Sequence, residues 1–137
     1  MTPETLALVH KAAYAPDRPW SVEEFAVLLD QPGIVVTGDE RGFALARVLF
    51  DEAELLTIAT HPDHRRQGIG YEVMQAWQSI SAQKGAARAF LEVAADNSAA
   101  RALYARCGYE QIGQRKGYYA RADAPAVDAI VMSLPLT

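Results

Sequence analysis

The sequence predicts an α/β protein of the α+β type, in which a single mixed sheet of about six strands is flanked by about four helices. Three observations lead to this fold class. The chain has 137 residues and is 50% hydrophobic, enough to bury the core of one globular domain over residues 1–137. Helical and strand patterns of apolar residues follow one another along the chain. Between residues 54 and 107 strand and helix alternate, which is typical of a crossover unit.

The first part of the chain is expected to form two helices. Residues 4–13 carry apolar side chains at roughly helical spacing. Ser21 is a typical N-cap for a second helix that continues through Leu29, because two glutamates follow in its first turn. Pro32 and Gly33 then end that helix.

Three strands are expected next. Residues 34–37 and 43–50 have strand composition, and the polar turn 38–42 between them contains glycines that favour a hairpin. Residues 54–60 form the third predicted strand.

The second half of the chain begins with a long predicted helix. Its apolar residues recur at steps of three or four, which gives the helix one buried face. The elements expected in this half are the helix 68–84, the strand 88–94, a helix capped within 96–98 and ended by Gly108, and the strands 109–116 and 127–134.

The charge of the chain limits its partners. A net charge of −4 argues against nucleic acid or an anionic membrane, which usually bind basic surfaces. No stretch approaches the ~20 apolar residues that span a bilayer, and the N-terminus lacks the pattern of a secretory signal. Cys107 is the only cysteine, so no internal disulfide forms, as is usual in a reducing compartment. We therefore expect a cytoplasmic protein without nucleic-acid or membrane partners.

The strongest local signal is the turn Arg65-Arg66-Gln67-Gly68-Ile69-Gly70 between a predicted strand and a predicted helix. Its glycines let the backbone approach an anion, and the N–H groups and dipole of the helix start favour negative charge. The turn lacks the Lys-Ser or Lys-Thr of nucleotide triphosphate sites and is too short for the dinucleotide pattern. By itself it is either a site for the phosphate of another cofactor or an ordinary tight turn.

This turn resembles the pyrophosphate-binding motif of the GNAT superfamily of N-acetyltransferases. Further segments resemble the bacterial ribosomal-protein-alanine N-acetyltransferases (RimI-type), in order, from about residue 19 to residue 136. They are Pro19-Trp20-Ser21, Asp51-Glu52-Ala53-Glu54-Leu55-Leu56, Ile58-Ala59, Leu91-Glu92-Val93, Asn97-Ser98-Ala99-Ala100, Ala102-Leu103-Tyr104, Tyr118-Tyr119 and Asp128-Ala129-Ile130-Val131-Met132. The resemblance implies the GNAT fold, with a mostly antiparallel sheet, and acetyl-CoA as cosubstrate without a metal.

The resemblance also implies roles for individual residues. The backbone of residues 58–60 is expected to pair with the pantetheine arm and residues 66–71 to hold the pyrophosphate, while Glu92 matches the general base of the family and Tyr104 its general acid. The residues expected to bind the coenzyme are Ile58, Ala59, Thr60, Arg65, Arg66, Gln67, Gly68, Ile69, Gly70, Tyr71 and Asn97.

Acyl transfer from a thioester needs a neutral amine that attacks and a thiolate that leaves. Glu92 could accept the proton directly or through a water, whereas without the resemblance a rim carboxylate paired with an arginine explains it as well. A thiol near pKa ~8.5 is more acidic than a phenol near ~10, so a hydrogen bond from Tyr104 to sulfur matters more than its proton. Without the resemblance, Tyr104 could simply cover the core edge, but it follows Asn97 by two helical turns, so one ligand could touch both.

Other reactive residues have simpler explanations. Cys107 could carry an acyl group, but it falls on an apolar helix face and is better explained as a buried thiol. His61 and His64 flank a proline in a loop without a third metal ligand, so they are interpreted as loop residues. The residues expected to shape the acceptor side of the cleft are Arg115, Lys116, Tyr118 and Tyr119.

Three features depart from the family pattern. Relatives carry an additional strand before the first helix, but few residues precede Leu6, so the first strand is expected to be missing or short. Tyr71 follows Gly70 where relatives often carry a basic or small residue, and His64 replaces a common aromatic.

The expected function is the transfer of acetyl from acetyl-CoA to the N-terminal α-amine, alanine, of a ribosomal protein in a direct ternary complex. An α-amine with a pKa near ~8 is partly neutral at pH 7, whereas a lysine amine with a pKa near ~10.4 is almost wholly protonated. The enzyme's base therefore has less proton to remove from an N-terminal acceptor than from a lysine. Two alternatives remain, a lysine or small-amine acetyltransferase on the same fold and a non-catalytic acyl-CoA-binding module. A nucleic-acid-binding domain has only two short basic clusters in its favour.

Overall fold

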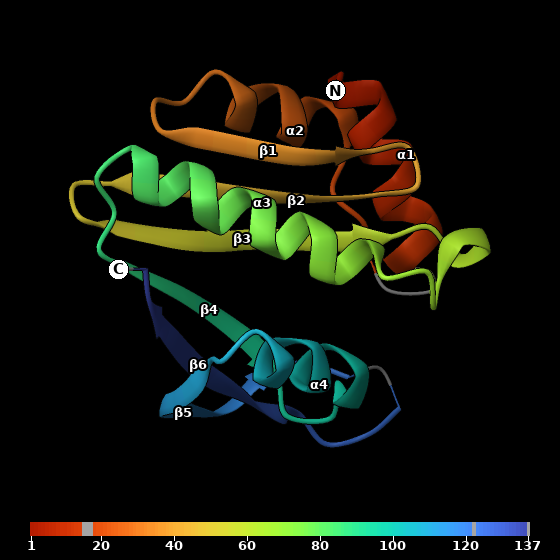
Figure 1. The fold of residues 1–137 in the computed structure, drawn as a ribbon. Coiled ribbons are helices and arrows are strands. Elements are labelled where there is room, and N and C mark those ends of the chain that lie inside the picture. The colour runs from red at the N-terminus through yellow and green to blue at the C-terminus, as the bar shows by residue number, and fades with distance from the viewer. Residues whose placement is uncertain (15–17, 122, 137) are drawn as a thin grey trace.

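The computed structural model describes residues 1–14, 18–121 and 123–136, so the predicted domain 1–137 is described apart from residues 15–17, 122 and 137. Within these residues an open six-stranded sheet has the order β1-β2-β3-β4-β6-β5 (Figure 1). The elements are α1 (Pro3–Tyr14), α2 (Val22–Leu29), β1 (Ile34–Asp39), β2 (Gly42–Leu49), β3 (Glu52–Thr60), a 3-10 turn (Pro62–His64), α3 (Ile69–Gln83), β4 (Arg88–Ala94), α4 (Ser98–Arg106), β5 (Glu110–Tyr119) and β6 (Val127–Pro135). The mixed, mostly antiparallel sheet that the sequence predicts is confirmed.

The element boundaries differ from the predictions by two residues or more at three strands. The first predicted strand, 34–37, continues to Asp39, because its pairing with β2 extends to Gly42. The third predicted strand begins two residues earlier, at Glu52, because pairing with β2 extends to Leu49. The predicted strand 109–116 continues to Tyr119, which pairs with Val127 beyond an irregular stretch around Gly117. The first described element is α1, and no strand precedes it in the described residues.

The antiparallel pair β2–β3 contains a bulge. Leu45 pairs with Thr57 while Ala46 pairs with Leu55, so Leu56 is an additional residue on β3. Because side chains alternate along a strand, one additional residue exchanges the two faces. Leu55 therefore lies in the core beneath α3, whereas Thr57 faces α1.

The parallel pair β3–β4 is short. The two strands are paired only from Glu52↔Arg88 to Glu54↔Phe90. Beyond these residues β3 stays with β2 and β4 stays with β6, so the two strands diverge, as Figure 1 shows. Within the described residues, the edge of β3 from Leu55 to Thr60 has no strand partner on the β4 side.

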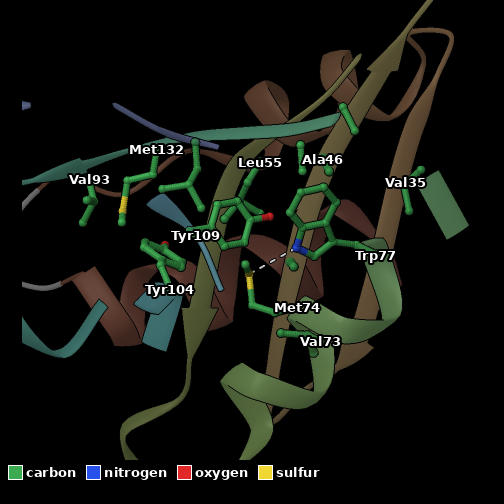
Figure 2. Close-up of a cluster of buried hydrophobic side chains, with 14 of the residues drawn as sticks. Val35, Ala46, Leu55, Val73, Met74, Trp77, Val93, Tyr104, Tyr109 and Met132 are labelled. Carbon is green, nitrogen blue, oxygen red and sulfur yellow. Dashed lines mark hydrogen bonds between the residues drawn. The ribbon is translucent and has the colours of Figure 1, made fainter. Parts of the chain in front are cut away.

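Two apolar clusters cover the two faces of the sheet. One lies under α1 and α2 and includes Phe25 and Phe43. The other lies under α3 and α4, where Trp77 donates a hydrogen bond from Nε1 to the Met74 sulfur at 3.2 Å (Figure 2). This second cluster contains residues of both β3 and β4, so it joins the two halves of the sheet on that face. No helix of the described residues combines the length and apolar character that crossing a bilayer requires.

Ser81 of α3 has a fully buried hydroxyl without a hydrogen-bond partner in the described residues. We expect Ser81→Ala to raise the free energy of unfolding by about 1.5 kcal/mol, because it removes an unsatisfied polar group and improves helix propensity. Ser79→Ala, on the exposed side of the same helix, reports propensity alone and should give about 0.5 kcal/mol. Urea denaturation measures both values, and a Ser81→Ala gain no larger than that of Ser79→Ala would contradict the prediction.

Candidate active site

Two cavities lie at the gap where β3 and β4 diverge. The turn cavity, of about 630 Å³, is lined by residues 58–60, by the turn around residues 64–70 and by α4. The splay cavity, of about 750 Å³, lies between residues 55–58 of β3 and 92–94 of β4. Tyr14, Ile58, Asn97 and Tyr104 line both cavities, so the two adjoin.

A third cavity continues this series on the other side. The α2 cavity, of about 820 Å³, lies between α2, residues 54–56 of β3 and the end of β5. It shares Trp20, Glu92 and Tyr119 with the splay cavity. The three cavities therefore adjoin in a row from the glycine turn across the open sheet to α2, and this row is called the channel below. Such an arrangement suits a reaction between two substrates that enter from opposite sides.

The glycine turn has the backbone of an anion site. Gly68 is the N-cap of α3 with φ of 78°, and a Cβ at this position would meet no atom within 4 Å. Its missing side chain leaves the N–H groups of the first helical turn without a side-chain cap. Arg66 also has a positive φ, 63°, which is strained for a residue with a Cβ. This geometry supports the anion-site interpretation of the turn.

Most predicted coenzyme residues converge on the turn cavity. Those that line it are Ile58, Ala59, Thr60, Arg65, Arg66, Gly68, Ile69, Gly70 and Asn97, together with His64. Gln67 and Tyr71 do not line it. The ring of Tyr71 instead lies under the guanidinium of Arg106, 4.8 Å from it, so this departure from the family pattern ties α3 to α4.

The edge of β3 is partly engaged by α1. The hydroxyl of Tyr14 donates a 2.6 Å hydrogen bond to the carbonyl of Ile58. Asn97 caps α4, because its side-chain oxygen accepts from the N–H of Ala100 at 3.2 Å. Both residues therefore hold fixed positions where the turn cavity meets the splay cavity.

Tyr104 lies on the inner side of α4, on the same cavities as Asn97, as their spacing predicts. Its residue exposure is 4%, and its hydroxyl has no hydrogen-bond partner in the described residues. Burial raises the pKa of the Tyr104 phenol further above its usual value. The hydroxyl is therefore suited to donate a hydrogen bond and poorly suited to release its proton.

Glu92 lies on β4 where the splay cavity meets the α2 cavity. Its side chain is 26% exposed, and its Oε1 lies 3.1 Å from Nε of Arg115. The sequence left open whether Glu92 is a cavity carboxylate or a partner of an arginine, and the structure shows both together. Of the four residues expected to shape the acceptor side, Tyr118 and Tyr119 line the α2 cavity, but Arg115 and Lys116 do not.

The remaining reactive residues lie apart from the channel or have structural roles. No three His, Cys, Asp or Glu side chains among the described residues are placed to hold a metal ion. The ring of His61 accepts a hydrogen bond from the backbone of Asp63. Cys107 packs against the core, and burial raises the pKa of its thiol, which disfavours the thiolate.

A buried histidine, which the sequence analysis missed, fixes the wall of the channel. Nδ1 of His10 accepts a 3.0 Å hydrogen bond from the N–H of Trp20, so Nε2 carries the hydrogen and donates to Thr57 at 3.1 Å. Its ring stacks on Tyr14 with centroids 4.1 Å apart. These contacts tie the segment before α2 to α1 and to the bulged part of β3. The available signal was the place of His10 four residues after Leu6, on the apolar face of the first helix.

Comparison with known proteins gives consistent results. The model of the acetyltransferase (GNAT) family matches residues 5–109. The chain is 36% identical over 123 residues to the [ribosomal protein bS18]-alanine N-acetyltransferase of Escherichia coli strain K12, which covers 87% of this chain and 82% of that protein.

Solved structures share the fold. The crystal structure of the ribosomal-protein-S18-alanine N-acetyltransferase from Escherichia coli matches with a TM-score of 0.87 and 33% identity, over 98% of this chain and 88% of that chain. Arabidopsis thaliana NAA60 in complex with acetyl-CoA matches with a TM-score of 0.81 over 97% of this chain and 92% of that chain, and at 18% identity it shows the fold alone. The predicted GNAT fold is confirmed.

The buried His10 makes stability depend on pH. Burial lowers its pKa to about 4, whereas in the unfolded chain it takes up a proton near 6.5. Between these values the unfolded chain binds more protons, so the free energy of unfolding falls as the pH falls. We expect His10 to contribute a loss of about 2 kcal/mol between pH 7 and pH 5. Denaturation at both pH values measures it, and a His10→Gln variant with an equal loss would contradict it.

Proposed function

The chain belongs to the GNAT family of acetyltransferases and is an acetyl-CoA-dependent N-acetyltransferase, and we propose that its acceptor is the N-terminal α-amine, alanine, of a ribosomal protein. The observation that carries this proposal is the position of Glu92 midway along a channel between the glycine turn and the α2 cavity. The similarity to an enzyme named for acetylating the alanine of a ribosomal protein, over 82% of its length, supports the acceptor. Residues 1–137 are proposed to act as a single domain.

We place the coenzyme in the turn cavity. The free N–H groups at the start of α3 and the charges of Arg65 and Arg66 suit a pyrophosphate, and the open space beside Gly68 allows close approach. The backbone of residues 58–60 has no strand partner on the β4 side, although the Ile58 carbonyl already accepts from Tyr14. This edge can pair with the amides of the pantetheine arm, which then takes the place of a strand between β3 and β4. Asn97 lies at the inner end of the cavity.

The acceptor peptide is placed in the α2 cavity. The carboxylates of Glu23, Glu24 and Glu54 at its wall outnumber the single cation Arg47, and this excess favours the approach of a cationic N-terminus. Trp20, Tyr118 and Tyr119 give it aromatic surface on which a peptide backbone can lie.

In the proposed reaction the neutral amine attacks the thioester carbonyl in a direct ternary complex. A C–N bond forms, the C–S bond breaks, and sulfur leaves with the electron pair of that bond. Glu92 accepts the proton that the amine loses, directly or through a water. Tyr104 donates a hydrogen bond to the departing sulfur, which suits a buried phenol that holds its proton.

Glu92→Gln tests the assignment of the base. We expect kcat to fall by roughly 100-fold to 1,000-fold, since the amide cannot accept a proton, while the dissociation constant for acetyl-CoA stays within about twofold. Steady-state thiol release and calorimetry measure the two quantities. Glu52→Gln, an exposed carboxylate on β3 outside the channel, is the matched control and should keep the wild-type rate. Wild-type turnover by Glu92→Gln would refute the assignment.

A peptide panel tests the acceptor. Peptides that begin with alanine should gain one acetyl group at the α-amine in mass spectra, with Glu92→Gln as the blank. Peptides blocked at the N-terminus but carrying internal lysines should gain none, because their amines are almost wholly protonated at pH 7. Acetylation of the blocked peptides or of small amines alone would show a lysine or small-amine acetyltransferase. Tight binding of acetyl-CoA without thiol release for any amine would show a non-catalytic module.

A further inference from the structure

Glu92 and Arg115 form an ion pair that crosses one strand. They lie on β4 and β5, which flank β6. Glu92 stands opposite Val131, and Val131 stands opposite Gly113, so these three residues form one row across the sheet. Arg115 lies two residues beyond Gly113, on the same face. Because Gly113 places no side chain next to Val131, the guanidinium can reach over β6 to Nε–Oε1 contact at 3.1 Å.

The pair is oriented with its cation outward. The Arg115 side chain is 58% exposed, whereas that of Glu92 is 26% exposed and faces the channel. The guanidinium also lies over the ring of Tyr118, 5.4 Å from its centroid, and Tyr118 lines the α2 cavity. Arg121, which lines the splay cavity with Glu92, pairs with Asp96 at 2.7 Å. Arg115 is therefore held between the carboxylate and the rim of the acceptor cavity.

A lone carboxylate at this place would hinder the reaction it serves. An α-amine arrives mostly as an ammonium at pH 7, and a nearby negative charge stabilises that protonated form, which has no lone pair for attack. An ammonium bound to Glu92 would be a stable but unproductive complex. A guanidinium beside the carboxylate opposes this, because it cancels much of the attraction and remains charged at every physiological pH.

The charges farther along the α2 cavity are arranged differently. Glu24 is paired with Arg18 at 2.7 Å, while Glu23 and Glu54 have no ion-pair partner among the described residues. Arg47, which stands opposite Glu54 on β2, adds one cation to this wall. The unpaired charges of the wall, Glu23 and Glu54 against Arg47, leave a net negative charge that attracts a cationic N-terminus, whereas the charge of Glu92 is matched by Arg115. This gradient draws the acceptor in without holding it as an ammonium at the reacting end.

We propose that Arg115 is a positioning residue that pairs with Glu92 so that the acceptor reaches the thioester as a neutral amine instead of being trapped as an ammonium–carboxylate pair. The proposal rests on the proposed role of Glu92 as base. An exposed ion pair with a purely structural role would contribute little to stability, and its removal would leave kcat and KM unchanged. The proposed positioning role instead predicts a change in both constants.

Arg115→Met tests the proposal in the full-length chain. Unproductive binding lowers kcat and the acceptor KM by the same factor, so we expect both to fall about tenfold while kcat/KM stays within about threefold. Arg115→Lys keeps a charge and should restore both constants to within roughly threefold of wild type. Lys116→Met, an exposed cation next to Arg115 that lines no cavity, is the matched control and should leave both unchanged. Thermal melting confirms that each variant is folded.

Three results would overturn the proposal. A fall in kcat with an unchanged or higher acceptor KM would show that Arg115 binds or orients the acceptor instead. Arg115→Met constants equal to those of Lys116→Met would show a surface ion pair without a kinetic role. If Glu92→Gln alone keeps wild-type turnover, the base assignment fails and this proposal fails with it. In the slow Glu92→Gln variant, by contrast, Arg115→Met should cause no further fall in kcat, because no carboxylate is left to trap the ammonium. This measurement distinguishes a failure of the Arg115 proposal from a failure of the base assignment.

Discussion

The gap that forms the candidate site exists because the parallel contact between β3 and β4 is short. After three residue pairs each strand continues with a different neighbour, β3 with β2 and β4 with β6. Where the sheet opens in this way, backbone N–H and C=O groups of β3 have no partner on β4. Such groups cost free energy if they are buried without a hydrogen bond. The apolar cluster under α3 and α4 contains Leu55 of β3 and Leu91 of β4, so the two halves stay joined on one face while the gap crosses the sheet. The channel that carries the proposed reaction is this gap.

The opposite face is fixed by polar contacts as well as by packing. The bulge at Leu56 turns Thr57 toward α1, where it meets the neutral imidazole of His10. The same imidazole accepts from the backbone of Trp20, and Tyr14 beside it donates to Ile58. The wall of the acceptor cavity and the edge offered to the coenzyme thus depend on one buried network. A network of this kind, with each partner satisfied, favours one arrangement of the channel over looser alternatives.

Local patterns were enough to predict the elements, whereas the individual residues of the candidate site were expected from the family resemblance. The apolar stripe through Ile69, Val73 and Trp77 is local, as is the glycine turn before it, so the helix and a possible anion site at its start follow from them. The coenzyme residues expected from the resemblance come from several elements, and only the fold shows which of them line one cavity. The bulge at Leu56 and the three-pair limit of the β3–β4 contact are matters of register, which packing between distant segments decides. The sequence predicted that Glu92 lies on a strand and left open that an arginine pairs with it. Only the fold shows that this arginine is Arg115, which reaches Glu92 across β6.

The most direct test of the central claim is amide hydrogen exchange across β3 with and without acetyl-CoA. If the coenzyme takes the place of a strand in the gap, amides within residues 58–60 and at the start of α3 gain protection, while those of residues 52–54, already paired with β4, do not change. Protection confined to α2 and β5, or none within residues 58–60, would contradict the account, because the open edge of β3 would then not be the coenzyme site.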